Sequence, residues 1–416
     1  MKWVATPLEP TSSWFKVRIE EMKVHFMDFD KLIERRGTDC SKWDKMESLY
    51  GVPPQDGIAM WVADMDFQPP ECIQEALENM INHGIYGYYG HEKSYRDAIC
   101  WWHETRHEWK VERSWIFNTH GLVNGTALCV SAFTNPGDGI VLFTPIYHSF
   151  FRIIKASERK ITQCPLDLKD GRYQMDIELY DTMMTGNEKL LVLSSPHNPG
   201  GRVWSKEELK GVLDFAKRHD LIIVSDEIHQ DIVYAGRKHI PFALIDETVN
   251  ERLIVMSAAT KTFNIAGGHT GNVILPDPKL RAVFSKKITA MGISPNNFGI
   301  VMAKAGYSQA GADWVDSLML YLEKNRNVFD EAMNELPGIV SMPLEGTYLS
   351  WVDFSGTGMS QKEILRRIEK EALIAVNHGT TFGLGGDGFL RFNIATQRTI
   401  LLRAIERLKN AFSDLQ

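Results

Sequence analysis

One lysine in the sequence stands where an amine could do chemistry. Lys261 lies among small and hydroxyl residues directly after the strand-like run 253–256. In such a setting a lysine can lose its charge, and its amine then becomes a nucleophile towards an aldehyde. A lysine considered alone is more often a solvated loop residue. The chemical interpretation therefore depends on the residues that accompany Lys261.

Polar, aromatic and glycine residues follow the other apolar runs of the chain in the same way. Because ligands of open parallel sheets collect at the carboxyl ends of the strands, we expect these residues to meet at one edge. The turn at Gly121 leads into a helix, and the backbone amides at such a helix start can bind an anion. Together the residues supply an anion cradle, a stacking ring, an amide, a carboxylate and an amine, which are the groups needed to hold pyridoxal phosphate. They are Gly121, Leu122, Val123, Tyr147, Asn198, Asp226, Thr260 and Lys261.

Regular alternation of short apolar runs and helical stretches predicts the elements that position these residues. We expect strands at 115–118, 139–143, 191–195, 221–225 and 253–257, and helices at 122–134, 148–156, 205–218 and 228–234. This order is typical of a three-layer α/β domain with a mostly parallel sheet. From about residue 312 longer helices (312–335, 360–372) and short strands (346–353, 389–394) predict a smaller α+β domain.

These patterns divide the chain into a large domain, 75–311, and a small domain formed by 27–74 together with 312–416. Residues 1–26 are expected to be an N-terminal extension that is not part of either domain. Two further helices are predicted before the alternating region. The first is opened by Pro69-Pro70 and runs to about His83, and the second covers 93–109.

The composition of the sequence argues against several classes of protein. A formal net charge of −7 without a long basic run argues against nucleic-acid binding. The five cysteines are scattered without a C-x-x-C pair, which favours reduced thiols in the cytoplasm. No apolar run reaches membrane-spanning length, and the N-terminus lacks the order of a signal peptide.

Three ordered motifs give the sequence a specific resemblance. Asn198-Pro199-x-Gly, Asp226-Glu227-Ile228-His229 and Thr260-Lys261-Thr262-Phe263-Asn264 resemble the fold-type I pyridoxal-phosphate enzymes of the class I/II aminotransferase superfamily. Within it, Ala63-Asp64-Met65-Asp66-Phe67 and Gly87-Tyr88 resemble the MalY/PatB branch of carbon–sulfur β-lyases. The resemblance implies α,β-elimination of cystathionine or related cysteine S-conjugates to a thiol, pyruvate and ammonia. The alternatives are an aminotransferase and, more remotely, a regulatory binding protein.

The resemblance also implies roles for single residues. Lys261 would carry the cofactor and move the substrate Cα proton, while Asp226 would pair with the pyridine nitrogen. Asn198 would bond the ring oxygen and contact substrate, and Tyr147 would stack on the ring. The cradle at 121–123 would hold the phosphate with Thr260. The remaining expected contacts are His229 to the cofactor, Arg391 and Ala63 to the substrate, and Tyr88 to the cofactor phosphate from the partner subunit of a homodimer.

Some features of the sequence depart from this interpretation or compete with it. His269 stands where many aminotransferases have a phosphate-binding arginine, so we expect a different phosphate site here. His103 and His107 match the H-E-x-x-H zinc pattern, but their neighbours suggest a charged helix face, and we predict no metal site. The glycines of 383–388 match a dinucleotide fingerprint, but a strand rather than a helix follows them.

Overall fold

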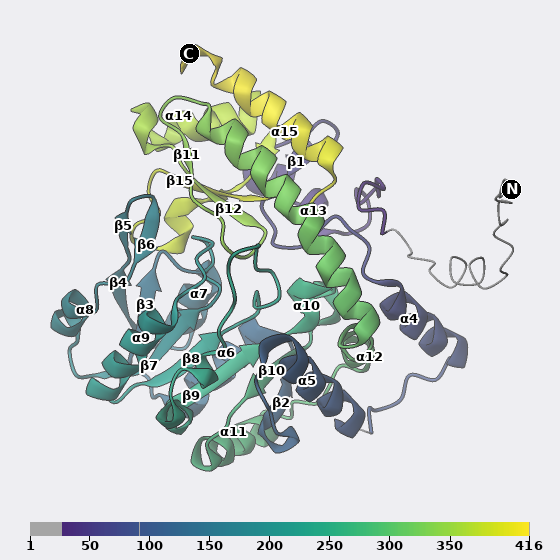
Figure 1. Ribbon diagram of the computed structural model, residues 1–416, viewed down its shortest axis with the longest axis vertical. Helices are drawn as coiled ribbons and strands as arrows, with labels where there is room; N and C mark the ends of the chain where they lie inside the picture. The colour runs from purple at the N-terminus through teal and green to yellow at the C-terminus, as the bar shows by residue number, and fades with distance from the viewer. Residues whose placement is uncertain (1–26, 91, 416) are drawn as a thin grey trace, which may run out of the picture.

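A seven-stranded sheet forms the larger part of the fold in the computed structural model, which describes residues 27–90 and 92–415 (Figure 1). The strands from β9 to β4 pair in parallel, whereas β10 runs antiparallel to both β9 and β2. The prediction of a mostly parallel sheet is confirmed, and β4 and β10 join the predicted strands. The order is β2 (Ile116–Thr119), β10 (Gly271–Ile274), β9 (Leu253–Ser257), β8 (Ile222–Asp226), β7 (Glu188–Ser194), β3 (Gly139–Thr144) and β4 (Lys160–Pro165).

Helices cover both faces of this sheet, which is why a central strand such as β3 is buried along its whole length. In β3, Ile140 and Leu142 belong to the core on one face, while Val141 and Phe143 belong to the core on the other. The first face packs against α6 (Leu122–Phe133), α7 (His148–Ala156) and α11 (Pro278–Ala290), and the second against α8 (Ile177–Met183) and α9 (Lys206–Arg218). The predicted three-layer α/β architecture is therefore confirmed.

A four-stranded antiparallel sheet lies above the large sheet in Figure 1. Its order is β11 (Val340–Ser341), β12 (Leu349–Asp353), β15 (Phe389–Asn393) and β14 (Asn377–His378). The helices α13 (Gln309–Asn334) and α15 (Arg398–Ala411) pack on each other beside it, with α14 (Gln361–Arg366) and the π-helical turn Arg367–Glu371.

The N-terminal part of the described chain joins this smaller sheet region. After α2 (Ser41–Asp44) and α3 (Met46–Tyr50), strand β1 (Ile58–Ala59) pairs in parallel with β13 (Ile374–Ala375). The domain boundaries at residues 74/75 and 311/312 remain a prediction, and the expected extension 1–26 lies outside the described residues. No helix in the described ranges is long and apolar enough to cross a membrane.

Helices around the junction of the two sheets complete the scaffold. The predicted helices near 70–83 and 93–109 are present as α4 (Glu71–His83) and α5 (Glu92–His107). The short α10 (Ala259–Thr262) follows β9, and α12 (Asn297–Gly306) packs against α4 and α5. A β-hairpin, β5 (Asp167–Lys169) with β6 (Arg172–Gln174), was not predicted.

Two sequence-based element predictions were wrong. Residues 228–234 form turns instead of a helix, because Val233 bridges to Gly346 and the Tyr234 amide donates to the Glu345 carbonyl. The backbone of Val233 and Tyr234 therefore bonds to the segment that leads into the smaller sheet. The strand expected from residue 346 begins only at Leu349, since Thr347 adopts a left-handed conformation with φ of 70°.

Candidate active site

A cavity of about 190 Å³ lies at the carboxyl ends of the parallel strands. It brings together ten of the residues predicted from the sequence: Ala63, Gly121, Leu122, Val123, Tyr147, Asn198, Asp226, His229, Thr260 and Lys261. Two predicted residues do not line it. Arg391 lies behind Asn198 and bonds to it, and the Tyr88 side chain is fully exposed.

The amine of Lys261 is placed by the short helix α10. Its Nζ donates to the carbonyl oxygen of Ala63 at 2.6 Å. Burial lowers the pKa of Lys261 to about 8, although the carboxylates of Asp64 and Asp226 act in the opposite direction. A substantial fraction of the amine is therefore neutral near physiological pH, as a nucleophile or proton acceptor requires.

Asp226 is a buried carboxylate without a cationic partner. It ends strand β8 with only 7% of its surface exposed, and its Oδ1 accepts the amide of Ile228 at 3.2 Å. Burial raises the pKa of Asp226 to about 7. Among the described residues no lysine, arginine or histidine forms an ion pair with it. A carboxylate in this state suits a cationic ring nitrogen supplied by a ligand.

The start of α6 forms the anion-binding end of the cavity. Gly121 is the N-cap with φ of 81°, and the first-turn amides of Leu122 and Val123 have no acceptor within the helix. Gly271 allows β10 to approach, because a Cβ there would lie 3.2 Å from the Leu122 nitrogen. Thr260 and His269 line the same cavity. The amides, a hydroxyl and an imidazole can together hold a phosphate.

Arg391 supplies a buried cation behind Asn198. Its guanidinium is 2% exposed and donates to Asn198 Oδ1 at 2.8 Å, to the Trp61 carbonyl at 3.0 Å and to Asn377 Oδ1. It lies 5.0 Å from the centre of the Phe382 ring. None of these partners is an anion, Nε is unpaired, and burial lowers the pKa of Arg391 to about 10. A carboxylate bound here would compensate the buried charge.

Aromatic rings complete the walls. Tyr147 is the N-cap of α7, and its ring packs against His148 and Phe150 at centroid distances of 4.8 and 5.6 Å. His229 is buried with its Nδ1 unpaired, and its ring meets Tyr348 edge-on at 5.9 Å. Burial and the charges of Lys261 and Arg391 lower the pKa of His229 well below its usual value. His229 is therefore a neutral imidazole.

An irregular strap, residues 61–67, closes the cavity from the side of the smaller sheet. Side chains rather than strand neighbours bind its carbonyl groups. Asn393 Nδ2 donates to the carbonyls of Val62 and Asp64 at 2.6 and 2.5 Å. Asn264, three residues after Lys261, donates to the carbonyls of Met65 and Phe67 and accepts the Met65 amide. The strap thus connects the Lys261 segment with the Arg391 strand.

Sequence reasoning missed several residues of the site. Asn377, Phe382 and Tyr348 lie far from the motifs along the chain, and only the folding of the smaller sheet brings them close. Other missed residues lie within a motif or within four positions of a predicted site or motif residue, and that proximity is the signal that could have identified them. These cavity-lining residues are His120, Phe150, Ser194, Ile228 and Ala266.

The histidines of the H-E-x-x-H sequence do not lie on a charged helix face, so that prediction was wrong. His103 and His107 are 1% and 6% exposed, because this face of α5 packs against the sheet. His103 Nε2 bonds Ser257 Oγ at 3.1 Å, and His107 Nε2 bonds Asp231 at 2.8 Å. Asp231 also accepts the hydroxyl of Thr262, next to Lys261, at 2.6 Å. The motif forms part of a buried network beneath the cavity.

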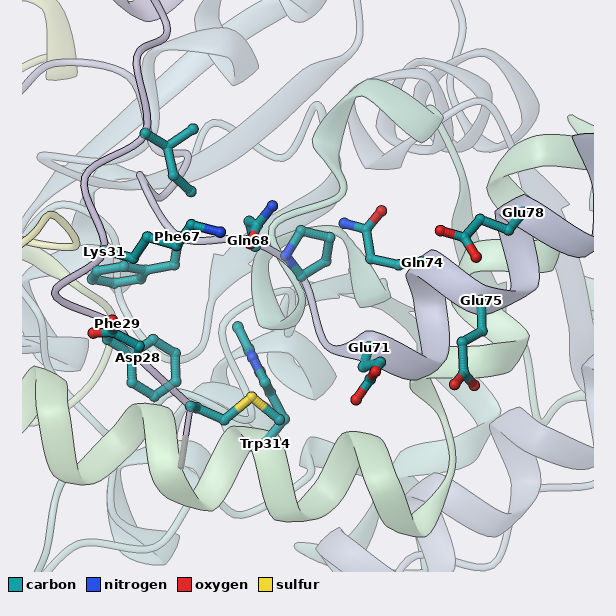
Figure 2. Close-up of a pocket in the computed structure, with 13 residues that line it drawn as sticks. Asp28, Phe29, Lys31, Phe67, Gln68, Glu71, Gln74, Glu75, Glu78 and Trp314 are labelled. Atoms are coloured by element: carbon teal, nitrogen blue, oxygen red, sulfur yellow. The ribbon is translucent and has the colours of Figure 1, made fainter. Parts of the chain in front are cut away.

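Another cavity, of about 450 Å³, lies between α4, α13 and the first described residues (Figure 2). Figure 2 shows Glu71, Glu75 and Glu78 along α4, with Trp314 rising from α13. Because its charged side chains are mainly acidic, this cavity does not suit a phosphate or a substrate carboxylate.

Comparison with known proteins identifies the family of the chain. The sequence profile "Aminotransferase class I and II" matches residues 56–408. Cystathionine beta-lyase PatB of Bacillus subtilis is 40% identical over 93% of this chain and 100% of PatB. Protein MalY of Escherichia coli is 27% identical over 92% of this chain and 98% of MalY.

A solved structure supports the same family assignment. Cystalysin from Treponema denticola, which contains a pyridoxal 5'-phosphate cofactor, is 36% identical and superposes with a TM-score of 0.89. The match covers 94% of this chain and 100% of the cystalysin chain. The chain therefore belongs to the class I and II aminotransferase family, in the branch that includes PatB and MalY.

Proposed function

We propose that this protein is a pyridoxal-phosphate-dependent carbon–sulfur β-lyase that cleaves L-cystathionine or related cysteine S-conjugates. One observation carries the proposal. In a chain 40% identical to a cystathionine β-lyase, a lysine with a lowered pKa and an unpaired buried carboxylate line one cavity, and an uncompensated buried arginine lies directly behind Asn198 in its wall.

The unsatisfied groups of the cavity fit this coenzyme. Asp226 lacks the cation that the protonated pyridine nitrogen would provide. The amides of Leu122 and Val123, with Thr260, would hold the phosphate, and Asn198 would bond the ring oxygen. Tyr147 would lie on the ring face, and His229, whose Nδ1 has no partner, would contact the coenzyme from the turn after β8. When bound, pyridoxal phosphate supplies an electron sink for the Cα–H bonding pair of an amino acid.

The residues of the chain account for the remaining steps. Arg391 holds the α-carboxylate of the substrate with its planar fork, together with Asn198. The amine of Lys261 removes the Cα proton, and its lowered pKa allows it to act near pH 8. The Cβ–S bond then breaks, and the sulfur leaves with the bonding pair and takes up a proton to give a thiol. The three-carbon fragment reacts with water to give pyruvate and ammonia.

The test is an assay of purified protein with L-cystathionine, following thiol and pyruvate, alongside the absorption spectrum. We expect a visible chromophore that borohydride fixes to Lys261, and equal amounts of pyruvate and homocysteine. The Lys261→Ala variant should lose both the fixed chromophore and the activity. Release of glutamate from 2-oxoglutarate and an amino donor, without pyruvate from cystathionine, would instead assign the protein as an aminotransferase.

The exposed residues of the loop after α4 support a homodimer. Ile85, Tyr86 and Tyr88 are exposed in the loop after α4, and Tyr86 packs on Phe298, which is itself 41% exposed. An apolar surface of this kind suits a protein partner. Tyr88 would reach the phosphate end of the partner's cavity. Light scattering should give twice the chain mass, and the Tyr88→Ala variant should bind coenzyme more weakly while remaining dimeric.

A further inference from the structure

Two donors share one carbonyl oxygen beside the proposed catalytic amine. The Ala63 oxygen accepts Lys261 Nζ at 2.6 Å and the hydroxyl of Tyr348 at 3.0 Å. Tyr348 comes from the start of the smaller sheet and is completely buried. Burial raises the pKa of its hydroxyl, so the group remains an O–H donor.

The shared carbonyl cannot turn away from these donors. The carbonyls on either side of it, those of Val62 and Asp64, are both held by the amide of Asn393, and the Trp61 carbonyl is held by Arg391. The Ala63 oxygen is therefore a fixed point in the strap. An amine that donates one N–H to it has a defined orientation, with its lone pair directed elsewhere.

Tyr348 also limits how strongly this carbonyl binds the amine. A carbonyl has two lone pairs, and a second donor weakens the bond to the first because both withdraw from the same oxygen. Hydrogen bonds are stronger to an ammonium than to a neutral amine. Removal of the hydroxyl would therefore favour the charged form of Lys261.

We propose that Tyr348 is a positioning residue for Lys261. The Tyr348 hydroxyl holds the Ala63 carbonyl in place as the acceptor of the Lys261 amine and prevents this carbonyl from binding the ammonium form too tightly. The inference rests on the proposed function, in which this amine carries the substrate proton.

Several charged or titratable groups besides Tyr348 act on the amine. Asp64 from the strap and Asp226 from β8 favour its charged form, Arg391 from β15 disfavours it, and His229 from the turn after β8 is a neutral imidazole. A substitution of Tyr348 by phenylalanine leaves all four in place, so a change in the titration of Lys261 reports the hydroxyl itself.

The experiment begins with cofactor-free protein. The rate of reductive methylation of Lys261 by formaldehyde and cyanoborohydride is measured against pH by peptide mass spectrometry. In Tyr348→Phe the midpoint should move upward by about 0.5 to 1 pH unit, as expected for a hydrogen bond that becomes stronger. In holoenzyme kcat should fall about 5- to 10-fold with KM nearly unchanged, and the acid limb of the kcat–pH profile should move in the same direction.

Two further variants make the result decisive. Tyr234→Phe removes another buried hydroxyl, one without a partner and outside the site, and should leave both profiles unchanged. 3-Fluorotyrosine at position 348 keeps the shape and donates more strongly, so the midpoint should move downward even if Tyr348→Phe folds poorly. Superimposable Lys261 profiles for wild type and both 348 variants would overturn the proposal. Since this titration needs neither coenzyme nor substrate, its result is separate from that of the lyase assay.

Discussion

Replacement of Asp226 by asparagine should stabilise the cofactor-free protein at pH 8. The pKa of Asp226 rises from 3.8 to about 7 because the carboxylate is buried without a cation. At about 1.36 kcal/mol per pKa unit, this rise corresponds to a cost of about 4 kcal/mol. Because the folded-state pKa is raised, the cost is absent below pH 3.8, develops between pH 3.8 and 7, and is complete above pH 7. An asparagine keeps the oxygen that accepts the Ile228 amide and carries no charge.

The assay is urea unfolding of cofactor-free wild type and Asp226→Asn at several pH values. The variant should be more stable by up to about 4 kcal/mol at pH 8, and the two should converge as the pH falls to 4. Asp231→Asn is the matched control, five positions further along the same segment. The Asp231 carboxylate accepts bonds from Trp102, His107 and Thr262, which keep its pKa below the usual value. This control should therefore be destabilised.

Bound coenzyme should reverse the stabilising effect of the Asp226→Asn substitution. With the pyridinium bound, Asp226 gains a buried ionic partner, and loss of such a partner costs about 3 to 5 kcal/mol. Asp226→Asn should then lower kcat/KM by at least about 100-fold while the cofactor-free protein is more stable. An Asp226→Asn protein that is less stable than wild type at pH 8, or equally altered at every pH, would refute the reasoning.

Three other substitutions test the rest of the site. Arg391→Lys should raise KM for the amino-acid substrate by about 30- to 100-fold in steady-state kinetics, because a point charge cannot replace the planar fork. The Lys261→Met variant should lose one pH-dependent contribution to the free energy of unfolding of the cofactor-free protein. In wild type the lowered pKa of Lys261 costs about 3 kcal/mol below pH 8, and this cost disappears as pH rises from 8 to 10.5, which urea unfolding will show. Asn264→Ala should destabilise the fold by about 3 to 5 kcal/mol, since three strap hydrogen bonds are lost and φ at this position is 56°. Asn264→Gly separates the two causes, because glycine adopts this φ without strain.

The residues that the sequence identified are those placed by local rules. Lys261, Asp226 and the cradle at Gly121 each lie at the end of a strand of the large sheet or within four residues after it, so the strand end fixes their location. Arg391 was found only through its resemblance to the family. It lies on an antiparallel strand of the other sheet, and no local pattern relates that strand to the cavity.

The residues that the sequence did not identify depend on contacts between distant segments. Nothing near Tyr348 in the sequence indicates that its hydroxyl meets Ala63, which lies 285 positions away. The face of α5 was misjudged because its charged residues suggested solvent, whereas His103 and His107 pair with Ser257 and Asp231 beneath the sheet. Histidines satisfied in this way are indistinguishable from exposed ones by residue type alone.

The parallel pairing of β1 with β13 has a consequence for the synthesis of the protein. Ile58 and Ala59 come before the strap, and their partners Ile374 and Ala375 leave the ribosome long after them. Asn393, whose Nδ2 donates to the carbonyls of Val62 and Asp64, emerges later still. The large sheet can form while translation continues, but the carbonyls of Trp61 and Val62 lack their Arg391 and Asn393 donors until those residues emerge. Coenzyme capture should therefore follow the emergence of Arg391 and Asn393, and nascent chains arrested before residue 374 should retain no coenzyme absorbance once pyridoxal phosphate has been supplied and the unbound fraction removed.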